Sequence, residues 1–521
     1  MLGKMATGVR PAWVIHRQEG SQIPSDTEGA RRYLRRGNLS EALFPGGPVP
    51  ALVAGDVALT HDELRTAADG AARRLYGAGV TQGTHVALFA ENSAAWIVSY
   101  LGLQRLGATV VGMNPAFKEA EAEQILSDSE AALTVVDGGR QPLIDALRPR
   151  LKSLRGTARV EEVGSSVPPP RPSPASGGGT FPPKGGQGED LLNSESPAIL
   201  LYTSGTTGRP KGALLDHGNL LAQARGVVEA WRWTAADRLV LALPLFHVHG
   251  LAIALNGSLI AGGCAVLVPF TPQNVVRELR AGGTMFFGVP AMYQRLCDYL
   301  DRNPADLRHV RLFVAGSAPL PAALFERCER ILGQLVLERY GITEGGIVVS
   351  NPYDGPRQPG RVGYPLPGVE IRLGELDEVQ LKGGQVFKGY WRNAAASTDA
   401  FVDGWFRTGD IGEIAQDGSL AIRGRIKELI ITGGYNVYPR EVEMVLEQHP
   451  AVAEVAVAGL PSERWGEEVT AFVVARTKVP AEELIAYARD RMATYKCPRA
   501  IRFIDVIPRN AMGKVDRSQL K

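Results

Sequence analysis

The sequence predicts an α/β fold that is divided into more than one domain. The chain has 521 residues, which is enough to bury a large core and to form two or more domains. Short apolar segments of strand length alternate with segments of helical periodicity, and this alternation indicates parallel βαβ units. A short apolar run at 198–201 leads directly into a loop of glycines and hydroxyl residues, which can hold a ligand.

A helix that opens after Thr60 is the first regular element in the chain. Thr60 can cap this helix, and Glu63 stands at the position that completes a capping box. The helix is expected to end near the glycines at 77–79. The elements predicted after it are strands at 86–89, 109–111, 135–136, 198–201 and 312–315, and helices at 93–106, from 290 and from 439.

Composition and charge limit the possible functions. The 57 lysines and arginines nearly balance the 55 acidic residues, so the net charge of +2 gives no reason to expect binding to nucleic acid or to a membrane. The four cysteines form no CxxC pair, so neither a zinc site nor a disulfide framework is indicated. No apolar run is long enough to span a bilayer.

The first 20 residues lack the apolar core of a secretory signal, although they contain few acids, which leaves an organellar transit peptide as an alternative. We therefore expect a cytoplasmic enzyme that acts on small molecules, as a monomer or a homodimer.

Two stretches are expected to lie outside the regular core. Residues up to about 47 show no regular pattern. Residues 167–188 are rich in proline, serine and glycine, so they cannot bury much apolar surface. We predict a flexible surface loop there rather than a domain boundary, because the strand and helix pattern resumes directly afterwards.

The segment 202–212 carries the strongest signal for a ligand. Glycines bring backbone N–H groups close to a ligand, and the hydroxyls and the terminal lysine can then hold phosphate oxygens. The spacing differs from that of the P-loop NTPases, and Pro210 argues against a helix that begins there. An ordinary polar loop is the alternative. The candidate phosphate-binding residues are Thr203, Ser204, Gly205, Thr206, Thr207, Gly208 and Lys211.

Three segments in the middle of the chain can line a pocket. His247 and His249 stand two residues apart in a turn; metal binding is the alternative to a role in a pocket wall, but no third ligand is apparent. Arg295 follows a helix start at Pro290, and a solvated surface arginine is its alternative interpretation. Ser317 follows a buried strand, and strand ends are where α/β sheets place ligands.

Further polar motifs follow in the second half. Segment 338–345 holds Tyr340, Gly341, Thr343 and Glu344, and a carboxylate near phosphate oxygens suits Mg²⁺. Asp410 closes segment 405–410 and can accept both hydroxyls of a ribose.

The last two motifs are basic. Arg425 and Lys427 lie in segment 424–430, and Lys514 lies on a glycine turn near the C-terminus. Standing alone, that lysine would be expected to be exposed and inert.

Taken in order, these motifs resemble the adenylate-forming superfamily, which comprises acyl-CoA synthetases, adenylation domains of peptide synthetases and luciferases. The resemblance extends from about residue 50 to residue 521. It implies a large N-terminal domain of layered βαβ sheets, residues 1–424, which a hinge at Lys427 joins to a small C-terminal α+β domain, residues 425–521. No carrier-protein segment follows Lys514, which favours a free-standing acyl-CoA synthetase.

The resemblance also implies a role for each candidate residue. The catalytic candidates are Lys514, Glu344 and Thr206, with Glu344 as the Mg²⁺ ligand. The ATP-binding candidates are Thr203, Ser204, Gly205, Thr206, Thr207, Gly208, Lys211, Tyr340, Gly341, Thr343, Asp410, Arg425 and Lys514. After a rotation about Lys427, the residues Gly433, Gly434 and Tyr435 would line a coenzyme A channel. A carboxylate first attacks the α-phosphorus of ATP, and the thiol of coenzyme A then attacks the acyl carbonyl.

The acyl-site segments look most like those of malonyl-CoA synthetases. These segments are 246–250, 292–295, 316–319, and 338–341 continuing to 351–355. A second carboxylate needs a buried cation, so we predict that Arg295 binds it, with Ser317 and His247 as hydrogen-bonding neighbours. Malonate is the predicted acid, and methylmalonate is a related one. The alternatives are a synthetase for a fatty or aromatic monocarboxylate and a non-catalytic binding module.

Overall fold

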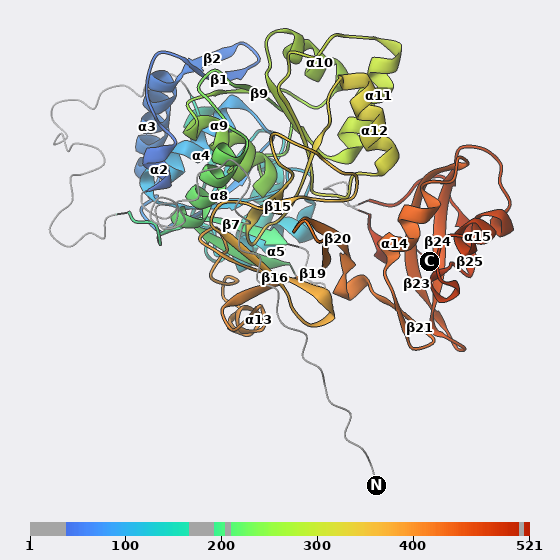
Figure 1. Cartoon of the computed structure of the whole chain (residues 1–521). Helices are drawn as coiled ribbons and strands as arrows, with labels where there is room; N and C mark the ends of the chain where they lie inside the picture. The colour runs from blue at the N-terminus through green and yellow to red at the C-terminus, as the bar shows by residue number, and fades with distance from the viewer. Residues whose placement is uncertain (1–37, 166–191, 204–209, 510–514, 521) are drawn as a thin grey trace, which may run out of the picture.

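The computed structural model describes residues 38–165, 192–203, 210–509 and 515–520. A large N-terminal domain carries a smaller C-terminal domain at one side (Figure 1). The loop predicted at 167–188 lies outside the described residues. The N-terminal stretch, predicted to be irregular up to about residue 47, contains the short helix α2 (Leu39–Ala42), so the prediction is wrong there. Asn38 caps this helix, and its Leu39 packs into the core, a contact that local periodicity does not reveal.

The first sheet has six strands in the order β6-β5-β3-β4-β7-β8. Five strands are parallel, as the alternation of strands and helices predicts, but the sixth, β8, is antiparallel to β7. The strands are β3 (His85–Phe89), β4 (Thr109–Gly112), β5 (Leu133–Val136), β6 (Gly156–Arg159), β7 (Pro197–Thr203) and β8 (Lys211–Asp216). A strand therefore follows Pro210, which confirms that no helix begins there.

The second sheet has nine strands in the order β15-β14-β13-β12-β11-β9-β10-β1-β2. Its centre is parallel, and its two edges are antiparallel hairpins that the βαβ pattern did not predict. The strands are β1 (Pro50–Ala54), β2 (Val57–Thr60), β9 (Arg238–Leu241), β10 (Cys264–Leu267), β11 (Met285–Gly288), β12 (Leu312–Ala315), β13 (Leu337–Ile342), β14 (Gly346–Ser350) and β15 (Tyr364–Pro365).

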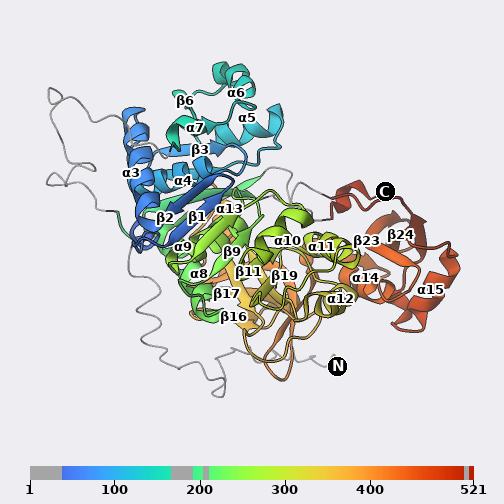
Figure 2. The same cartoon turned by 90° about the horizontal axis from the view of Figure 1, so that it is seen from above.

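Helices cover both sheets, and the capping box that the sequence predicts is confirmed. Thr60 and Glu63 form a complete capping box at the start of α3 (His61–Gly77). Ser93 caps α4 (Ala94–Leu106), which ends at Gly107 in the left-handed conformation, with φ of 69°. The other helices of this domain are α5 (Glu119–Asp128), α6 (Gln141–Leu147), α7 (Val160–Val163), α8 (His217–Ala230), α9 (Asn256–Ile260), α10 (Pro272–Arg280), α11 (Pro290–Arg302), α12 (Ala322–Leu332) and α13 (Ala394–Asp399). Figure 2 shows α5, α6 and α7 at one end and α10, α11 and α12 nearer the C-terminal domain.

A third sheet of five strands completes the N-terminal domain and leads into the C-terminal one. Its strands are β16 (Val369–Leu373), β17 (Glu378–Gly383), β18 (Phe401–Val402), β19 (Trp405–Ile414) and β20 (Leu420–Arg425). Directly after β20, a single 3-10 turn at Ile426–Glu428 leads to the C-terminal domain.

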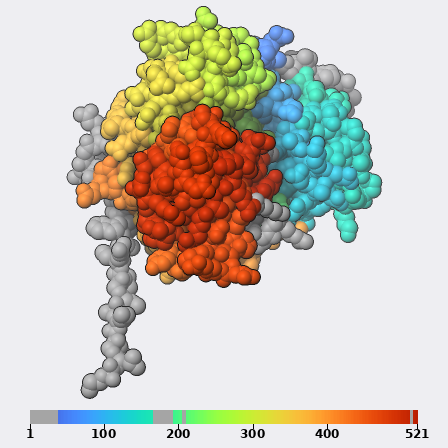
Figure 3. Space-filling model, turned by 90° about the vertical axis from the view of Figure 1, so that its right-hand side faces the viewer, coloured from blue at the N-terminus to red at the C-terminus, as the bar shows by residue number. Residues whose placement is uncertain are grey.

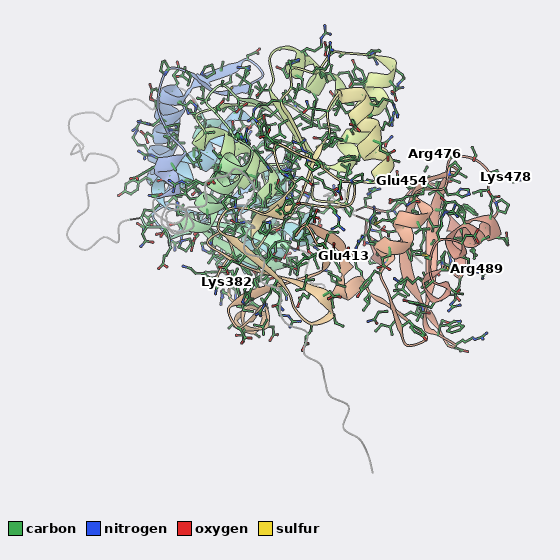
Figure 4. The ribbon with its side chains drawn as sticks, in the orientation of Figure 1. Lys382, Glu413, Glu454, Arg476, Lys478 and Arg489 are labelled. Atoms are coloured by element: carbon green, nitrogen blue, oxygen red, sulfur yellow. The ribbon has the colours of Figure 1, made fainter. Side chains whose placement is uncertain are left out.

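The C-terminal domain has its own sheet and its own hydrophobic core. Its elements are β21 (Ile430–Thr432), β22 (Tyr435–Val437), α14 (Pro439–Leu446), β23 (Val452–Ser462), β24 (Gly466–Ala475), α15 (Ala481–Arg489) and β25 (Ala500–Phe503). Figure 3 shows this domain in front of the N-terminal domain, and Figure 4 shows its outer rim with Arg476, Lys478 and Arg489. The predicted two-domain α/β fold is therefore confirmed.

The cysteines lie closer together than their sequence spacing indicates. Cys297 on α11 and Cys328 on α12 are buried free thiols whose Sγ atoms are 3.6 Å apart. Within the described ranges, we find no helix with the length and apolar character that crossing a bilayer requires.

Candidate active site

Asp410 is the centre of a buried polar cluster that joins three predicted site residues. The Tyr340 hydroxyl donates to Asp410 Oδ2 over 2.6 Å, and Arg425 Nε lies 2.8 Å from Asp410 Oδ1. Asp410 and Arg425 are register partners on β19 and β20, and Tyr340 reaches them from β13. The nearby Asp410 carboxylate raises the pKa of Arg425. A carboxylate has about four acceptor positions, so Asp410 can still accept two ribose hydroxyls.

Glu344 lies beside a second tyrosine, which the sequence analysis missed. The Tyr390 hydroxyl donates to Glu344 Oε1 over 2.9 Å, and Lys211 Nζ lies 5.2 Å from the centre of the Tyr390 ring. A β-bridge between Ala213 and Tyr390 holds this tyrosine against β8. No sequence motif marks Tyr390, because it reaches Glu344 only through this tertiary contact.

The surroundings of Glu344 fit a divalent cation. Burial raises the pKa of its carboxyl group, and within the described part of the chain no lysine or arginine nitrogen lies within 4.0 Å of it. A bound cation would favour the ionised carboxylate, and Mg²⁺ needs only one or two carboxylates in addition to phosphates.

The predicted phosphate loop connects two paired strands. Thr203 ends β7, Lys211 begins β8, and these two residues are register partners. The Thr203 hydroxyl donates to the Lys211 carbonyl over 3.4 Å. The predicted residues Ser204, Gly205, Thr206, Thr207 and Gly208 lie outside the described residues.

Gly341 lies near the end of β13, and Thr343 lies in the turn between β13 and β14. A β-bulge separates Tyr340 from Gly341, and a Cβ at Gly341 would overlap the Gly346 carbonyl. Glycine is therefore required there for the two strands to pair. The tip of this hairpin, which carries Thr343 and Glu344, therefore lies beside the Asp410 cluster.

The C-terminal candidates are only partly described. Lys427 lies in the 3-10 turn after β20, and burial and the neighbouring Arg425 lower its pKa. Gly433 and Gly434 have φ values of 57° and 82° at the tip of the β21–β22 hairpin, where only glycine adopts such angles readily. Tyr435 is 58% exposed and stacks on Tyr495. The predicted catalytic Lys514 lies outside the described residues.

A cavity of about 210 Å³ lies at the carboxyl ends of neighbouring parallel strands. Segments that follow β9, β11 and β12 supply its walls, which is the usual place for a ligand in a parallel sheet. The lining residues are Leu243, Pro244, His247, His249, Gly250, Phe270, Val289, Ala291, Met292, Arg295 and Ser317. The three predicted acid-binding residues, His247, Arg295 and Ser317, are thus brought together.

Arg295 lines this cavity, but it is not the buried cation that the sequence analysis predicted. The residue is exposed, and its guanidinium lies 4.9 Å from the centre of the Phe270 ring. It follows the buried Tyr293 by two positions on α11, which turns its side chain away from the helix core. The expectation of burial is therefore wrong.

His249, rather than His247, contacts Ser317. The Ser317 hydroxyl lies 3.3 Å from His249 Nδ1, and His247 Nδ1 accepts a hydrogen bond from the His249 backbone N–H. Burial, together with the positive Arg339 and with His247, lowers the pKa of His249 well below its ordinary value, so this imidazole is neutral at pH 7. Ser317 has φ of 68°, a strained value for a residue other than glycine.

Comparison with known protein families is consistent with this arrangement. The family described as "AMP-binding enzyme" matches residues 46–391, and the one described as "AMP-binding enzyme C-terminal domain" matches residues 441–514. Together the two matches cover the nucleotide-site candidates on β13 and the strands β23, β24 and β25 of the C-terminal sheet.

Individual relatives match along almost the whole chain. The 2-succinylbenzoate–CoA ligase of Bacillus licheniformis is 35% identical over 483 residues, which cover 90% of this chain and 96% of that protein. The human malonate–CoA ligase ACSF3, described as mitochondrial, is 34% identical over 486 residues, which cover 84% of this chain and 82% of that protein.

Solved structures share the fold. The crystal structure of ATP-bound MatB from Rhodopseudomonas palustris has a TM-score of 0.83 and 34% identity, and the match covers 93% of this chain and 98% of that one. The apo structure of the same protein, at equal identity and coverage, gives a TM-score of 0.75. The present structure is therefore closer to the ATP-bound form, and the chain belongs to the family of AMP-binding enzymes, within the adenylate-forming superfamily.

Proposed function

We propose that this protein is an AMP-forming acid–CoA ligase whose acid substrate is a small dicarboxylate. Malonate is the first choice and methylmalonate the second. The observation that carries the proposal is the cavity in which Arg295, His247 and Ser317 meet. A guanidinium can bind a carboxylate through two parallel hydrogen bonds, and the hydroxyl and imidazole groups can supply further ones.

The size of the cavity supports a short acid. Its volume of about 210 Å³ lies below the roughly 300–1,000 Å³ that is usual for drug-sized ligands. A long acyl chain would need more space. A dicarboxylate would also give the exposed Arg295 guanidinium a charged partner, because within the described ranges it is paired only with the face of Phe270.

In the first half-reaction, the acid carboxylate attacks the α-phosphorus of ATP and pyrophosphate leaves. Two anions must approach each other, so the main task of the protein is to neutralise charge and to position the reactants. Asp410 would accept the ribose hydroxyls, and the loop from Thr203 to Lys211 would hold the phosphates. Glu344 would hold Mg²⁺, which neutralises phosphate charge when bound. Lys514 would bridge the substrate carboxylate and the nucleotide.

In the second half-reaction, the thiol of coenzyme A attacks the acyl carbonyl and AMP leaves. We propose that the C-terminal domain, residues 425–521, rotates about Lys427 between the two steps, so that Gly433, Gly434 and Tyr435 line the coenzyme A channel. The single 3-10 turn between β20 and β21 supports this proposal, because a hinge needs only a few residues that absorb the change in backbone dihedral angles.

A ligase for a fatty or aromatic monocarboxylate is the second candidate. The exposure of Arg295 favours it, since an arginine at the mouth of a cavity can remain solvated with any acid bound. Relatives named for a monocarboxylate, such as the long-chain-fatty-acid–CoA ligase of Bacillus subtilis at 33% identity, are about as similar as those named for malonate.

The test is AMP release that depends on both ATP and coenzyme A, with malonate, methylmalonate, acetate, octanoate and 4-coumarate. Wild-type protein and Arg295→Leu are compared. We expect malonate to react fastest, and we expect the variant to lose malonate activity while it keeps any activity with monocarboxylates. If octanoate or coumarate reacts fastest and the variant behaves like wild type, the proposed acid is wrong.

A further inference from the structure

The buried cation behind the acyl cavity is Arg339, not Arg295. Arg339 lies on β13 and is only 5% exposed. Its Nε and Nη2 atoms have no hydrogen-bond partner, and within the described ranges no carboxylate lies within 4.0 Å of it. A guanidinium with two unsatisfied nitrogens in the interior is unusual, because buried charges are normally paired.

The neighbouring carboxylate does not neutralise Arg339. Glu338 precedes it on the same strand, and successive side chains of a strand point to opposite faces. Glu338 Oε1 accepts a hydrogen bond from the Leu320 backbone N–H on that opposite face. The β13 strand therefore holds a carboxylate and a guanidinium side by side in sequence without pairing them.

Arg339 instead packs behind two residues of the cavity wall. A Cβ added to Gly316 would overlap the Arg339 guanidinium, so the side chain lies directly against the turn that carries Ser317. On the other side, Arg339 is close enough to His249 to lower the pKa of that imidazole. His249 and Ser317 both line the cavity and contact each other.

The charge on Arg339 is permanent at neutral pH. Burial lowers its pKa, but only to about 9, so the group remains a cation at pH 7. An unpaired buried charge destabilises the folded protein, and replacing such groups with apolar side chains is often neutral or stabilising. Because Arg339 lowers the stability of the folded protein, we infer that it has a role other than stabilisation.

We propose that Arg339 is a second specificity-determining cation of the acyl site, which favours an acid with a second carboxylate through the wall formed by Gly316, Ser317 and His249. The proposal rests on the proposed function, since it assigns this charge to the same cavity. Arg295 would bind the distal carboxylate at the mouth of the cavity. Arg339 would attract the same carboxylate electrostatically through the cavity wall. Because burial and the nearby Arg339 hold His249 neutral, that imidazole can bond Ser317 without adding a charge of its own.

The experiment compares wild type with Arg339→Met, Arg339→Lys and Arg295→Met. Methionine keeps much of the side-chain length without the charge, and lysine keeps the charge. Two acids are used, malonate and 3-methylbutanoate, in which an isopropyl group replaces the second carboxylate. The readouts are kcat/KM for each acid and the thermal unfolding temperature with and without 20 mM malonate, a concentration chosen for the assay as roughly saturating.

We expect Arg339→Met to lower kcat/KM for malonate by about 50-fold, the effect of removing one unit charge if the distal carboxylate binds roughly 7 Å from it at an effective dielectric constant of about 20. The value for 3-methylbutanoate should change by less than about threefold, and Arg339→Lys should recover most of the malonate activity. Without ligand, Arg339→Met should unfold at the wild-type temperature or above it. Malonate should raise the unfolding temperature of wild type but not of this variant.

Three results would overturn the proposal. Arg339→Met could lose both acids equally together with a lower unfolding temperature, which would assign a structural role. It could keep the wild-type preference for malonate while Arg295→Met loses it, in which case the proposed function stands and only Arg339 is misassigned. Wild type could prefer 3-methylbutanoate, in which case the proposed function is wrong and the role of Arg339, which rests on it, is wrong as well.

Discussion

Replacing Asp410 with asparagine tests the nucleotide site at its most connected residue. The change removes one negative charge but keeps the shape of the side chain. Asp410 accepts a hydrogen bond from Tyr340 over 2.6 Å and pairs with Arg425 over 2.8 Å. In the proposed site, the same carboxylate also binds the ribose of ATP.

The expected magnitudes follow from these contacts. A buried hydrogen bond to a charged group contributes about 1.5–3 kcal/mol, whereas the ion pair with Arg425 adds less than about 1 kcal/mol because 38% of that side chain is exposed. We therefore expect Asp410→Asn to lower the free energy of unfolding by about 2 kcal/mol. Loss of the charged ribose acceptor should raise KM for ATP by about 10- to 100-fold.

Glu413→Gln is the matched control. Glu413 lies on the same strand, β19 (Figure 4), and pairs with Arg423 over 2.6 Å, but half of its side chain is exposed. The control should change KM for ATP by less than twofold and the free energy of unfolding by less than about 1 kcal/mol. The assays are AMP release at varied ATP and thermal unfolding of each variant. If Asp410→Asn keeps the wild-type KM for ATP, or if both variants shift it equally, the assignment of Asp410 to the ribose is wrong.

Two other variants test the surroundings of the site. Tyr390→Phe removes the hydrogen bond to Glu344, which lowers the pKa of this carboxyl group and so favours the ionised form that binds Mg²⁺. AMP release by the variant should therefore need about tenfold more Mg²⁺. An unchanged Mg²⁺ dependence would contradict the role of Glu344. Burial raises the pKa of Glu338 from 4.5 to about 7, so the folded protein holds a proton that the unfolded chain releases between these values. The free energy of unfolding of wild type should therefore fall by up to roughly 3 kcal/mol as the pH rises from about 5 to 8. Glu338→Gln should lack this part of the fall when unfolding is measured at each pH. Parallel pH profiles for the two proteins would contradict the raised pKa of Glu338.

The sequence correctly predicted features that depend on interactions between residues close together in the chain. The capping box at Thr60 and the absence of a helix start at Pro210 each depend on residues a few positions apart. The parallel centre of both large sheets follows from alternating strands and helices. The antiparallel edges do not, since a hairpin and a βαβ unit can contain the same apolar strands.

The site was predicted as a set of residues but not as a set of contacts. Motif spacing placed Tyr340, Asp410 and Arg425 among the candidates, yet only the fold shows that Asp410 bonds to both of the others. Tyr390 and Arg339 were missed because each reaches the site through a contact with a segment that is distant in sequence. The burial expected for Arg295 belongs to Arg339, because Arg295 lies on an exposed face of helix α11 whereas Arg339 lies on the buried strand β13.

The choice of acid is the central claim, and one competition experiment tests it most directly. Wild-type protein is given ATP, Mg²⁺, coenzyme A and an equimolar mixture of malonate, methylmalonate, acetate, 3-methylbutanoate, octanoate and 4-coumarate. The acyl-CoA products are then quantified by mass spectrometry. The account predicts that malonyl-CoA is the main product and methylmalonyl-CoA the next. A mixture dominated by octanoyl-CoA, coumaroyl-CoA or another monocarboxylate product would contradict it.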